Sequence, residues 1–229
     1  SGFVNGETTN VLSGAPSLTC AAETNSPVGP YTIDAAVGTL SAPNYSLSFS
    51  NGTLTVNRAV LTVAADDKGR SYGATNPVFS ATYSGFVNGE ATNVLSGEPS
   101  LTSVAETNSP IGTYPIVAAL GTLSATNYGF DFTNGTLTVG KAVLLVLADN
   151  QVRAYGSTNP VLTYRLEGFV DGETTNVVSG AAALSTSART NSPIGNYDIV
   201  TALGTLSANN YALMASNGTL TVTQTVLQA

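Results

Sequence analysis

Side chains able to catalyse a reaction are few in this chain, and histidine is absent. Nucleophilic catalysis needs a base beside the nucleophile, so aspartate, glutamate or lysine would have to serve. The chain repeats itself, and a group that every repeat needs should recur in every copy. One acidic position recurs in all three copies, as Glu7, Glu90 and Glu173. Glycoside hydrolysis needs a pair of carboxylates, so we expect no catalytic residues and no enzyme activity.

The recurring glutamate stands at the start of the one helix candidate of each copy, residues 90–96 in the middle copy. Gly97 follows this segment at a usual C-terminal position. A carboxylate at a helix start stabilises the free amide groups and the positive end of the helix dipole. We therefore predict a structural capping role for Glu7, Glu90 and Glu173.

The best metal candidates are two adjacent acids, Asp66 and Asp67, which match Asp149 and Asn150 in the next copy. Their oxygens, with the recurring glutamate nearby, could bind Ca²⁺ between repeats. A calcium site usually has several acids at alternating positions, and this pair is adjacent. Turn capping is therefore the favoured interpretation, and we expect no metal and no cofactor.

Asparagine precedes glycine at the same place in each copy, within the sequence Asn-Gly-Thr-Leu-Thr-Val. The three residues are Asn51, Asn134 and Asn217. Asn-Gly between alternating hydrophobic residues is a strong hairpin signal, because both turn residues need positive φ. We predict a hairpin at Asn134-Gly135 that joins strands at 128–132 and 136–139. The same residues match the glycosylation sequon, but the hairpin explains them.

Tyrosine recurs in the expected strands and also in loops, at Tyr72 and Tyr155. An exposed tyrosine can stack on a sugar. It can equally close the end of a small domain, with its hydroxyl bonded to a loop. Packing is the favoured interpretation for the tyrosines as a group, and Tyr72 and Tyr155 remain the candidates for exposed aromatic residues.

These residues are positioned by repeats that follow one another without insertion. The segment Ser-Gly-Phe-Val-Asn-Gly-Glu begins at Ser1 and Ser84, and returns as Glu-Gly-Phe-Val-Asp-Gly-Glu at Glu167, so that the step is 84−1 = 83 and 167−84 = 83. A fixed period of this length predicts a tandem array of small domains. The predicted division is a partial repeat at 1–57, complete repeats at 58–140 and 141–223, and the start of a further repeat at 224–229.

Residues 1–57, 58–140 and 141–223 are called the first, middle and last repeat below. The broken ends suggest a piece of a longer array, and the short junction at 139–142 suggests a stiff, extended string. Within a repeat, short apolar runs alternate with turns rich in Gly, Pro and Asn. This pattern predicts a mainly β domain with six or seven short strands and at most one short helix.

Composition excludes several classes of partner. The net charge is −7 with only 7 basic residues, which argues against nucleic acid and against anionic membrane surfaces. The sequence has no transmembrane run. Cysteine occurs once, at Cys20, and its counterparts are Ser103 and Thr186, so a disulfide shared by all repeats is excluded.

Five segments in order carry a family resemblance. They are Ala-Asp-Asp-Lys with the following Tyr72-Gly73, Ser-Gly-Phe-Val-Asn-Gly-Glu, Ser-Pro-Ile-Gly-Thr-Tyr-Pro-Ile, Asn-Tyr, and Asn-Gly-Thr-Leu-Thr-Val. Across essentially the whole chain the sequence resembles the MBG domain of the YGX type, a repeat of very large bacterial surface proteins and adhesins. The resemblance implies a mainly β, β-grasp-like module at an extracellular site. The strand count also fits an immunoglobulin-like β-sandwich.

The expected function is structural: a segment of a long extracellular protein of the bacterial cell surface, forming a stalk, fibre or filament for adhesion or biofilm architecture. Neighbouring repeats are the expected partners, with possible self-association into fibres or bundles. One alternative is a multivalent module that binds a glycan or protein, although the ligand is unknown and the most repeated residues belong to turns and core. Another is a subunit that polymerises by strand addition, since 224–229 match an opening strand that the first repeat lacks.

Overall fold

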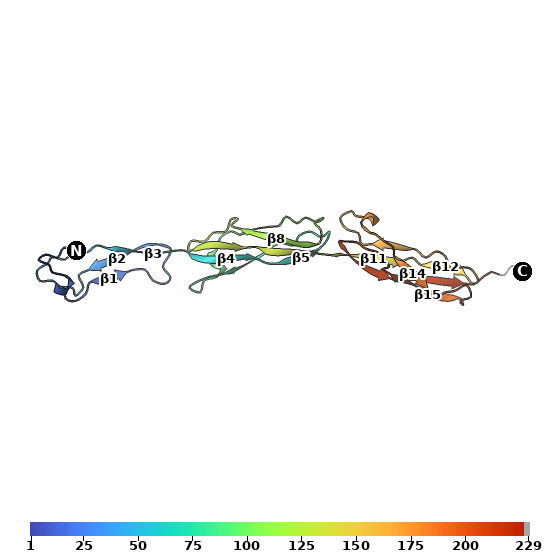
Figure 1. Ribbon diagram of the computed structural model, residues 1–229, viewed down its shortest axis with the longest axis horizontal. Coiled ribbons are helices and arrows are strands. Elements are labelled where there is room, and N and C mark those ends of the chain that lie inside the picture. The colour runs from blue at the N-terminus through green and yellow to red at the C-terminus, as the bar shows by residue number, and fades with distance from the viewer. Residues whose placement is uncertain (227–229) are drawn as a thin grey trace. The chain divides into compact units, whose positions relative to one another are not determined.

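The computed structural model describes residues 1–226 (Figure 1). It divides into two compact units. The first unit contains residues 1–64, 81–100 and 118–133, and the second contains 65–80, 101–117 and the chain from Asn134 onward. The division falls inside the middle repeat. Each junction between consecutive repeats therefore lies within one unit, the first-to-middle junction in the first unit and the middle-to-last junction in the second.

The last repeat lies entirely in the second unit and shows the whole fold (Figure 1). Its elements are β11 (Ala142–Ala148), β12 (Gln151–Ala154), β13 (Tyr164–Glu167), the 3₁₀ turn η3 (Thr175–Val177), β14 (Ala183–Thr186), β15 (Gly195–Ala202), β16 (Tyr211–Ser216) and β17 (Gly218–Thr223). They form two sheets, a three-stranded sheet of order β13-β11-β16 and a four-stranded sheet of order β12-β17-β15-β14.

Two long extended segments connect these sheets. β11 continues into β12 after Asp149 and Asn150, and β16 continues into β17 after Asn217. The segments run parallel, since β11 pairs with β16 from Ala142↔Tyr211 onward, and β12 pairs with β17 up to Ala154↔Thr223. The first and last segments of the repeat are thus neighbours in both sheets.

The middle repeat has all of the corresponding elements, and the first repeat has the counterparts of η3, β14, β15 and β17. The middle repeat contains β4 (Ala59–Ala65), β5 (Lys68–Ser71), β6 (Ala81–Ser84), η2 (Thr92–Val94), β7 (Ser100–Thr102), β8 (Gly112–Ala119), β9 (Tyr128–Thr133) and β10 (Gly135–Gly140). The first repeat contains η1 (Thr9–Val11), β1 (Ser17–Cys20), β2 (Gly29–Ala36) and β3 (Gly52–Val56). Their sheets have the orders β6-β4-β9, β5-β10-β8-β7 and β1-β2-β3.

The core follows the period of two that strands impose. In β11 the alternate residues Ala142, Leu144, Val146 and Ala148 are buried. The core of the last repeat gathers Ala148, Ala188, Ile199 and Leu220, with Leu162, Leu184 and Tyr197 packed against it. Because strands from both sheets contribute, this core joins the two sheets of the repeat.

The prediction of a mainly β fold with at most one short helix per repeat is confirmed. The helix candidate 90–96 shrinks to the 3₁₀ turn Thr92–Val94, since a run containing the β-branched residues Thr92 and Val94 is a poor helix former. Across the described residues no α-helix occurs, and the strands of a complete repeat form two sheets, as in the β-sandwich alternative. No helix of the described chain is long and apolar enough to cross a membrane.

The predicted Asn-Gly hairpins are wrong. Neither the three asparagines nor the glycines that follow them have positive φ, and the chain runs straight through from β9 to β10 and from β16 to β17. The amide oxygen of Asn217 instead accepts the backbone N–H of Thr201 (3.0 Å), and Asn51 does the same for Ala35 (3.0 Å). In the last repeat, the Asn217 side chain therefore links the segment from β16 to β17 to the neighbouring strand β15, at the point where the segment passes from one sheet to the other.

The glycine has a packing role at this point. A Cβ placed on Gly218 would lie 2.8 Å from the carbonyl oxygen of Ala148, and one on Gly135 would lie 2.5 Å from that of Ala65. Glycine is thus needed because two backbones approach closely.

Candidate functional site

The segment Gly-Phe-Val-Asp-Gly-Glu of the last repeat folds around Tyr211, at the start of β16. The Tyr211 hydroxyl accepts the backbone N–H of Val170 (3.1 Å) and donates to the Glu173 carboxylate. Phe169 meets the tyrosine ring edge-on at 5.9 Å. Asp171 turns the chain with a φ of +57°. The segment therefore supplies one ring contact and two hydrogen bonds to a tyrosine that is only 2% exposed.

Tyr72 of the middle repeat enters the same site. Its hydroxyl donates to Oε1 of Glu173 (2.9 Å), while Tyr211 uses Oε2. The two tyrosine rings meet edge-to-face at 5.8 Å. The Glu173 carboxylate thus accepts hydrogen bonds from two phenol hydroxyls, one from each repeat. Hydrogen bonds to a charged acceptor are stronger than those between neutral groups.

Burial, together with the hydrogen bonds to Glu173, alters the acidity of both phenols. Burial is the largest cause and the Glu173 hydrogen bond the second, and together they raise the pKa of Tyr211 to about 12. The same two causes raise the pKa of Tyr72. Both effects disfavour the phenolate, so both hydroxyls remain donors at neutral pH.

Gly73 lets the two repeats approach. It has a φ of +78°, and a Cβ at this position would lie 2.3 Å from Cγ2 of Val170. The pair Tyr72-Gly73 is therefore explained as a unit: the tyrosine binds Glu173, and the glycine makes room for Val170.

The asparagines of two Asn-Tyr pairs add polar contacts across the junctions. Oδ1 of Asn210 accepts the backbone N–H of Ile111 (3.4 Å), and Oδ1 of Asn127 accepts that of Val28 (3.2 Å). The Asn210 carbonyl also accepts the N–H of Ala142 (3.0 Å), which starts β11.

Apolar residues surround these polar contacts. The buried cluster at the middle-to-last junction draws residues from both repeats: Tyr72, Val139, Ala142, Leu144, Ala208 and Tyr211. This junction is a packed interface, with one residue between β10 and β11 in place of a linker.

The predicted capping by the recurring glutamate is wrong in mechanism. The carboxylates of Glu7, Glu90 and Glu173 bind the hydroxyls of Tyr45, Tyr128 and Tyr211. The 3₁₀ turns have no acidic residue in their first turn and no side-chain cap. A three-residue turn has almost no dipole for a carboxylate to stabilise.

The calcium candidates are engaged in strand connections. Oδ1 of Asp67 accepts the N–H of Thr136 (2.6 Å), as Oδ1 of its counterpart Asn150 accepts that of Thr219 (2.8 Å). An amide replaces a carboxylate in the same role, so charge is not required there. Asp66 accepts the hydroxyl of Ser80 (2.5 Å).

Asp149 is held by hydrogen bonds from Thr163 (2.7 Å) and Arg165 (3.0 Å). The Thr163 hydroxyl and then Arg165 lower the pKa of this carboxyl. Within the described residues, no group of three or more His, Cys, Asp or Glu side chains could hold a metal ion.

Sequence reasoning missed a buried arginine that ties two loops together. In the last repeat Nε of Arg153 donates to Oδ1 of Asn159 (2.7 Å), and Nη1 donates to the carbonyl of Ala154 (3.2 Å). Nη2 reaches the carbonyl of Arg189, and Asn159 donates to that of Ala188 (2.7 Å). The guanidinium thereby links β12 to the loop that follows β14.

The middle repeat has the same arrangement, with Arg70 donating to Asn76 (2.7 Å) and to the carbonyls of Ser71 and Glu106. Arg70 and Arg153 are 83 residues apart, as are Asn76 and Asn159. Their recurrence was a usable signal.

Tyr72 was expected among the exposed aromatic residues, and this is wrong, since it is 4% exposed. Tyr155, its counterpart, is 48% exposed. The difference arises because Tyr72 packs on the following repeat, a contact that sequence propensities do not encode.

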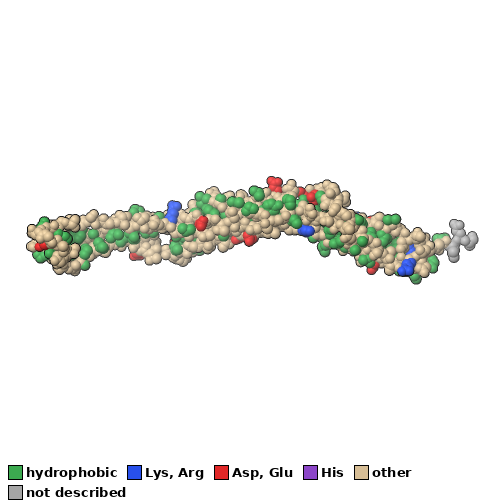
Figure 2. All heavy atoms as spheres, in the orientation of Figure 1, with side chains coloured by type: hydrophobic (Ala, Val, Ile, Leu, Met, Phe, Trp, Pro, Cys, Tyr) green, Lys and Arg blue, Asp and Glu red, His purple; other side chains and the backbone are tan. Residues whose placement is uncertain are grey.

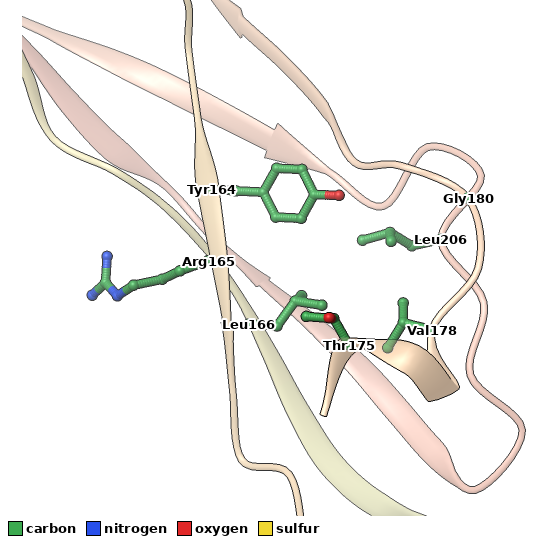
Figure 3. A pocket seen from close by; sticks show the side chains of 7 residues that line it. All are labelled: Tyr164, Arg165, Leu166, Thr175, Val178, Gly180 and Leu206. Atoms are coloured by element: carbon green, nitrogen blue, oxygen red, sulfur yellow. The ribbon is translucent and has the colours of Figure 1, made fainter. Parts of the chain in front are cut away.

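The last repeat has an open cleft of about 460 Å³. It is lined by Tyr164, Arg165, Leu166, Thr175, Val178, Gly180 and Leu206 (Figure 3). The Arg165 side chain points away from the other lining residues (Figure 3) and is paired with Glu167 and Asp149. The middle repeat has Ala81 and Thr82 in place of Tyr164 and Arg165, so the cleft is not a site that the repeats share.

The surface also lacks a concentrated charge on the face shown in Figure 2, where basic and acidic side chains stand singly among uncharged ones. Taken together, the fold and the site define a mainly β tandem-repeat protein whose most elaborate side-chain cluster joins one repeat to the next.

The chain belongs to the family of the MBG domain (YGX type), whose sequence model matches residues 1–55, 61–138 and 144–221. The chain is therefore a tandem array of a repeat that is typical of surface proteins. None of the curated proteins searched matches it.

Proposed function

We propose that this chain is a structural segment of an extracellular bacterial surface protein, and that its repeats resist tension as part of a stalk or fibre. The observation that carries the proposal is the parallel pairing of the first and last extended segments of a repeat. In the last repeat the chain enters at Ala142, the start of β11, and leaves at Thr223, the end of β17.

Tension between these two ends loads the strand ladders in shear. β11 and β12 are drawn in one direction, while β16 and β17 are drawn in the other, because each pair is parallel. All the hydrogen bonds of a ladder must then lengthen together. An antiparallel pair pulled apart at its open end instead loses its bonds one at a time.

The junction supports the same role, because it passes tension between repeats without a flexible linker. β10 ends at Gly140 and β11 begins at Ala142. Beside this connection, the Tyr72 hydroxyl binds Glu173 and the two repeats share a buried apolar cluster. An adhesive role would need a ligand site, and the cleft beside Tyr164 does not recur.

Single-molecule force spectroscopy tests the proposal. The 229-residue chain, with Cys20→Ser to remove its one thiol, is pulled by its ends. We expect each complete repeat to unfold in one step that lengthens the chain by about 240 Å. About 83 extended residues span about 280 Å, and the folded repeat already spans about 40 Å, the length of the segment from β11 to β12.

The control pulls the same repeat in a different direction, through cysteines introduced at Ala183 and Ala202. These residues face each other at the open end of the antiparallel pair β14–β15, so this pull separates the strands one bond at a time. We expect a clearly lower force. Equal forces in the two directions would remove the shear argument and with it the proposed role.

A further inference from the structure

The strand β16 of the last repeat lies at an open edge of its sheet. In the sheet of order β13-β11-β16, β11 pairs with one side of β16, and no strand of the described chain pairs with the other side. The counterpart β9 has the same position in the sheet of order β6-β4-β9. The middle repeat has one repeat before it and one after it, so the open edge is a property of the repeat itself and does not depend on its neighbours.

The register with β11 determines which backbone groups face this open edge. The N–H of Ala142 donates to the carbonyl of Asn210 (3.0 Å), and Ala142 lies opposite Tyr211 in the parallel pair. Backbone groups of successive residues in a strand point to opposite sides, so the even-numbered residues of β16 bond to β11. Leu213 and Ala215 therefore direct their N–H and C=O groups outward, toward the place that a further strand would take.

β16 also lacks the charges and prolines that usually protect an edge strand from pairing. Its six residues, Tyr211–Ser216, include neither. The other edge strands of the last repeat differ, since β12 contains Arg153, β13 contains Arg165 and Glu167, and β14 has only four residues. β16 is therefore the longest uncharged edge of this repeat.

The side chains beside this edge are apolar, in contrast to those of the middle repeat. On the outer face of the sheet, Leu145 of β11 lies beside Met214, which is 54% exposed. Their counterparts in the middle repeat are Thr62 and Asp131. A charge thus protects the centre of β9, whereas β16 has an exposed apolar side chain at the same position.

We propose that β16 pairs antiparallel with β16 of a second copy of this chain, about a two-fold axis at Met214. In this register Leu213 of each copy lies opposite Ala215 of the other, so that the outward N–H and C=O groups of both residues are all paired. Met214 lies directly opposite its copy on the outer face, where the two apolar side chains meet. The two three-stranded sheets become one continuous sheet.

A second copy fits this edge because β16 is complementary to itself. The outward groups of Leu213 and Ala215 satisfy one another across the axis, and no charge lies near the axis, since β16 carries none. The equivalent pairing of β9 would place Asp131 opposite a second Asp131, and like charges directly opposite are destabilising. Pairing is therefore specific to the last repeat.

The contact uses the same surface of both copies, so it closes as a dimer. It involves one strand from each copy, and small interfaces bind weakly, so association belongs in the micromolar-to-millimolar range of protein concentration. Each copy carries a net charge of −7, and the resulting repulsion is screened by salt. The contact depends on recognition between copies and not on the tension resistance proposed above.

Sedimentation velocity of the full chain, measured under reducing conditions from micromolar to millimolar concentration, tests the inference. The weight-average sedimentation coefficient of the wild type should rise with concentration toward that of a dimer, and more steeply at higher salt. Met214→Asp places two carboxylates opposite each other and should abolish the rise. Val143→Asp adds the same charge to the same outer face at a 50% exposed position of β11, one strand away from the edge, and should retain the rise.

A disulfide cross-link tests the register. In a Cys20→Ser background, Met214→Cys places two thiols opposite each other, and oxidation by dissolved oxygen should join two chains. Val143→Cys in the same background keeps its thiols apart and should form linked dimers more slowly.

A wild type that stays monomeric at every concentration overturns the inference. So does a Met214→Asp variant that associates like the wild type, or a Met214→Cys variant that cross-links no faster than Val143→Cys. Loss of association in both aspartate variants would mean that the outer faces stack on each other, and this also overturns edge pairing. The force measurement on a single repeat does not involve this contact, so the two proposals fail separately.

Discussion

Replacing Gly218 with alanine should destabilise the last repeat, because this glycine lies where two backbones nearly touch. Its own φ is compatible with alanine, since it is not in the positive region. An added Cβ would lie 2.8 Å from the carbonyl oxygen of Ala148 and 3.1 Å from the Ala148 Cβ. The first distance is shorter than packed atoms tolerate, so β11 or β17 must move.

The expected magnitude combines two opposing contributions. Inserting a methyl group into a packed site costs about 1–3 kcal/mol. Replacing glycine restricts the unfolded chain and returns about 0.4–1 kcal/mol. The net loss for Gly218→Ala is therefore between about 0 and 2.6 kcal/mol, with a central value of about 1.3 kcal/mol. Each kcal/mol corresponds to about 4–8 °C in the melting midpoint of a domain of this size.

Gly52→Ala is the matched control, because Gly52 occupies the same place in the same Asn-Gly-Thr-Leu-Thr-Val sequence. The atoms nearest its added Cβ belong to the side chain of Ile33 at 3.6 Å, an ordinary contact. This variant should be neutral or more stable by about 0.4–1 kcal/mol.

Calorimetric melting of both variants, with hydrogen exchange to assign the effect to the last repeat, measures the difference. In a hairpin both glycines would need positive φ, and both substitutions would be strained equally. Equal losses in the two variants would therefore refute the close-approach explanation.

Three further predictions concern single sites. The pKa of Tyr211 is raised to about 12 from the usual value of about 10. Its contribution to stability is therefore complete below about pH 10 and is lost as pH rises to about 12. Unfolding measurements over this pH range should show a smaller loss of stability in Tyr211→Phe than in the wild type. Arg153→Lys removes the planar fork that binds Asn159 and two carbonyls, and should lower the stability of the last repeat by about 2 kcal/mol in denaturant unfolding. Calcium should leave the melting temperature unchanged, because Asp67 and Asp149 already accept hydrogen bonds; a rise that EDTA reverses would contradict this assignment.

The sequence predicted the repeats and the mainly β class because both depend on local, periodic information. Alternating apolar residues mark strands directly, as in Thr136–Val139, which falls within β10. The Asn-Gly prediction failed for a related reason. The Asn-Gly pattern usually marks a turn between two strands. Here the same pattern occurs where an extended segment passes from one sheet to the other, and the glycine is needed because the backbone approaches the carbonyl of Ala65. The local sequence is the same in both cases, so it does not distinguish them.

The role of Tyr72 could not be predicted from one repeat, since its hydroxyl binds Glu173 of the next repeat, and Glu173 binds Tyr211 of its own repeat as well. A glutamate before a short helical segment is ordinarily a cap. Here the segment is too short, and a tyrosine hydroxyl competes successfully for the carboxylate. Arg153 differs, because its recurrence with Asn159 at the step of 83 residues is visible in the sequence.

The junction also changes what counts as the functional unit of the array. Tyr72-Gly73 belongs to one repeat, whereas Val170 and Glu173 belong to the next. The Tyr72-Gly73 pair does not explain itself within its own repeat, since the tyrosine hydroxyl binds Glu173 and the glycine makes room for Val170. The pair is explained once the two repeats fold together at their junction as one site. A Tyr72→Phe variant should therefore leave each repeat folded while weakening the coupling between their unfolding transitions, which calorimetry of the wild type and variant measures directly.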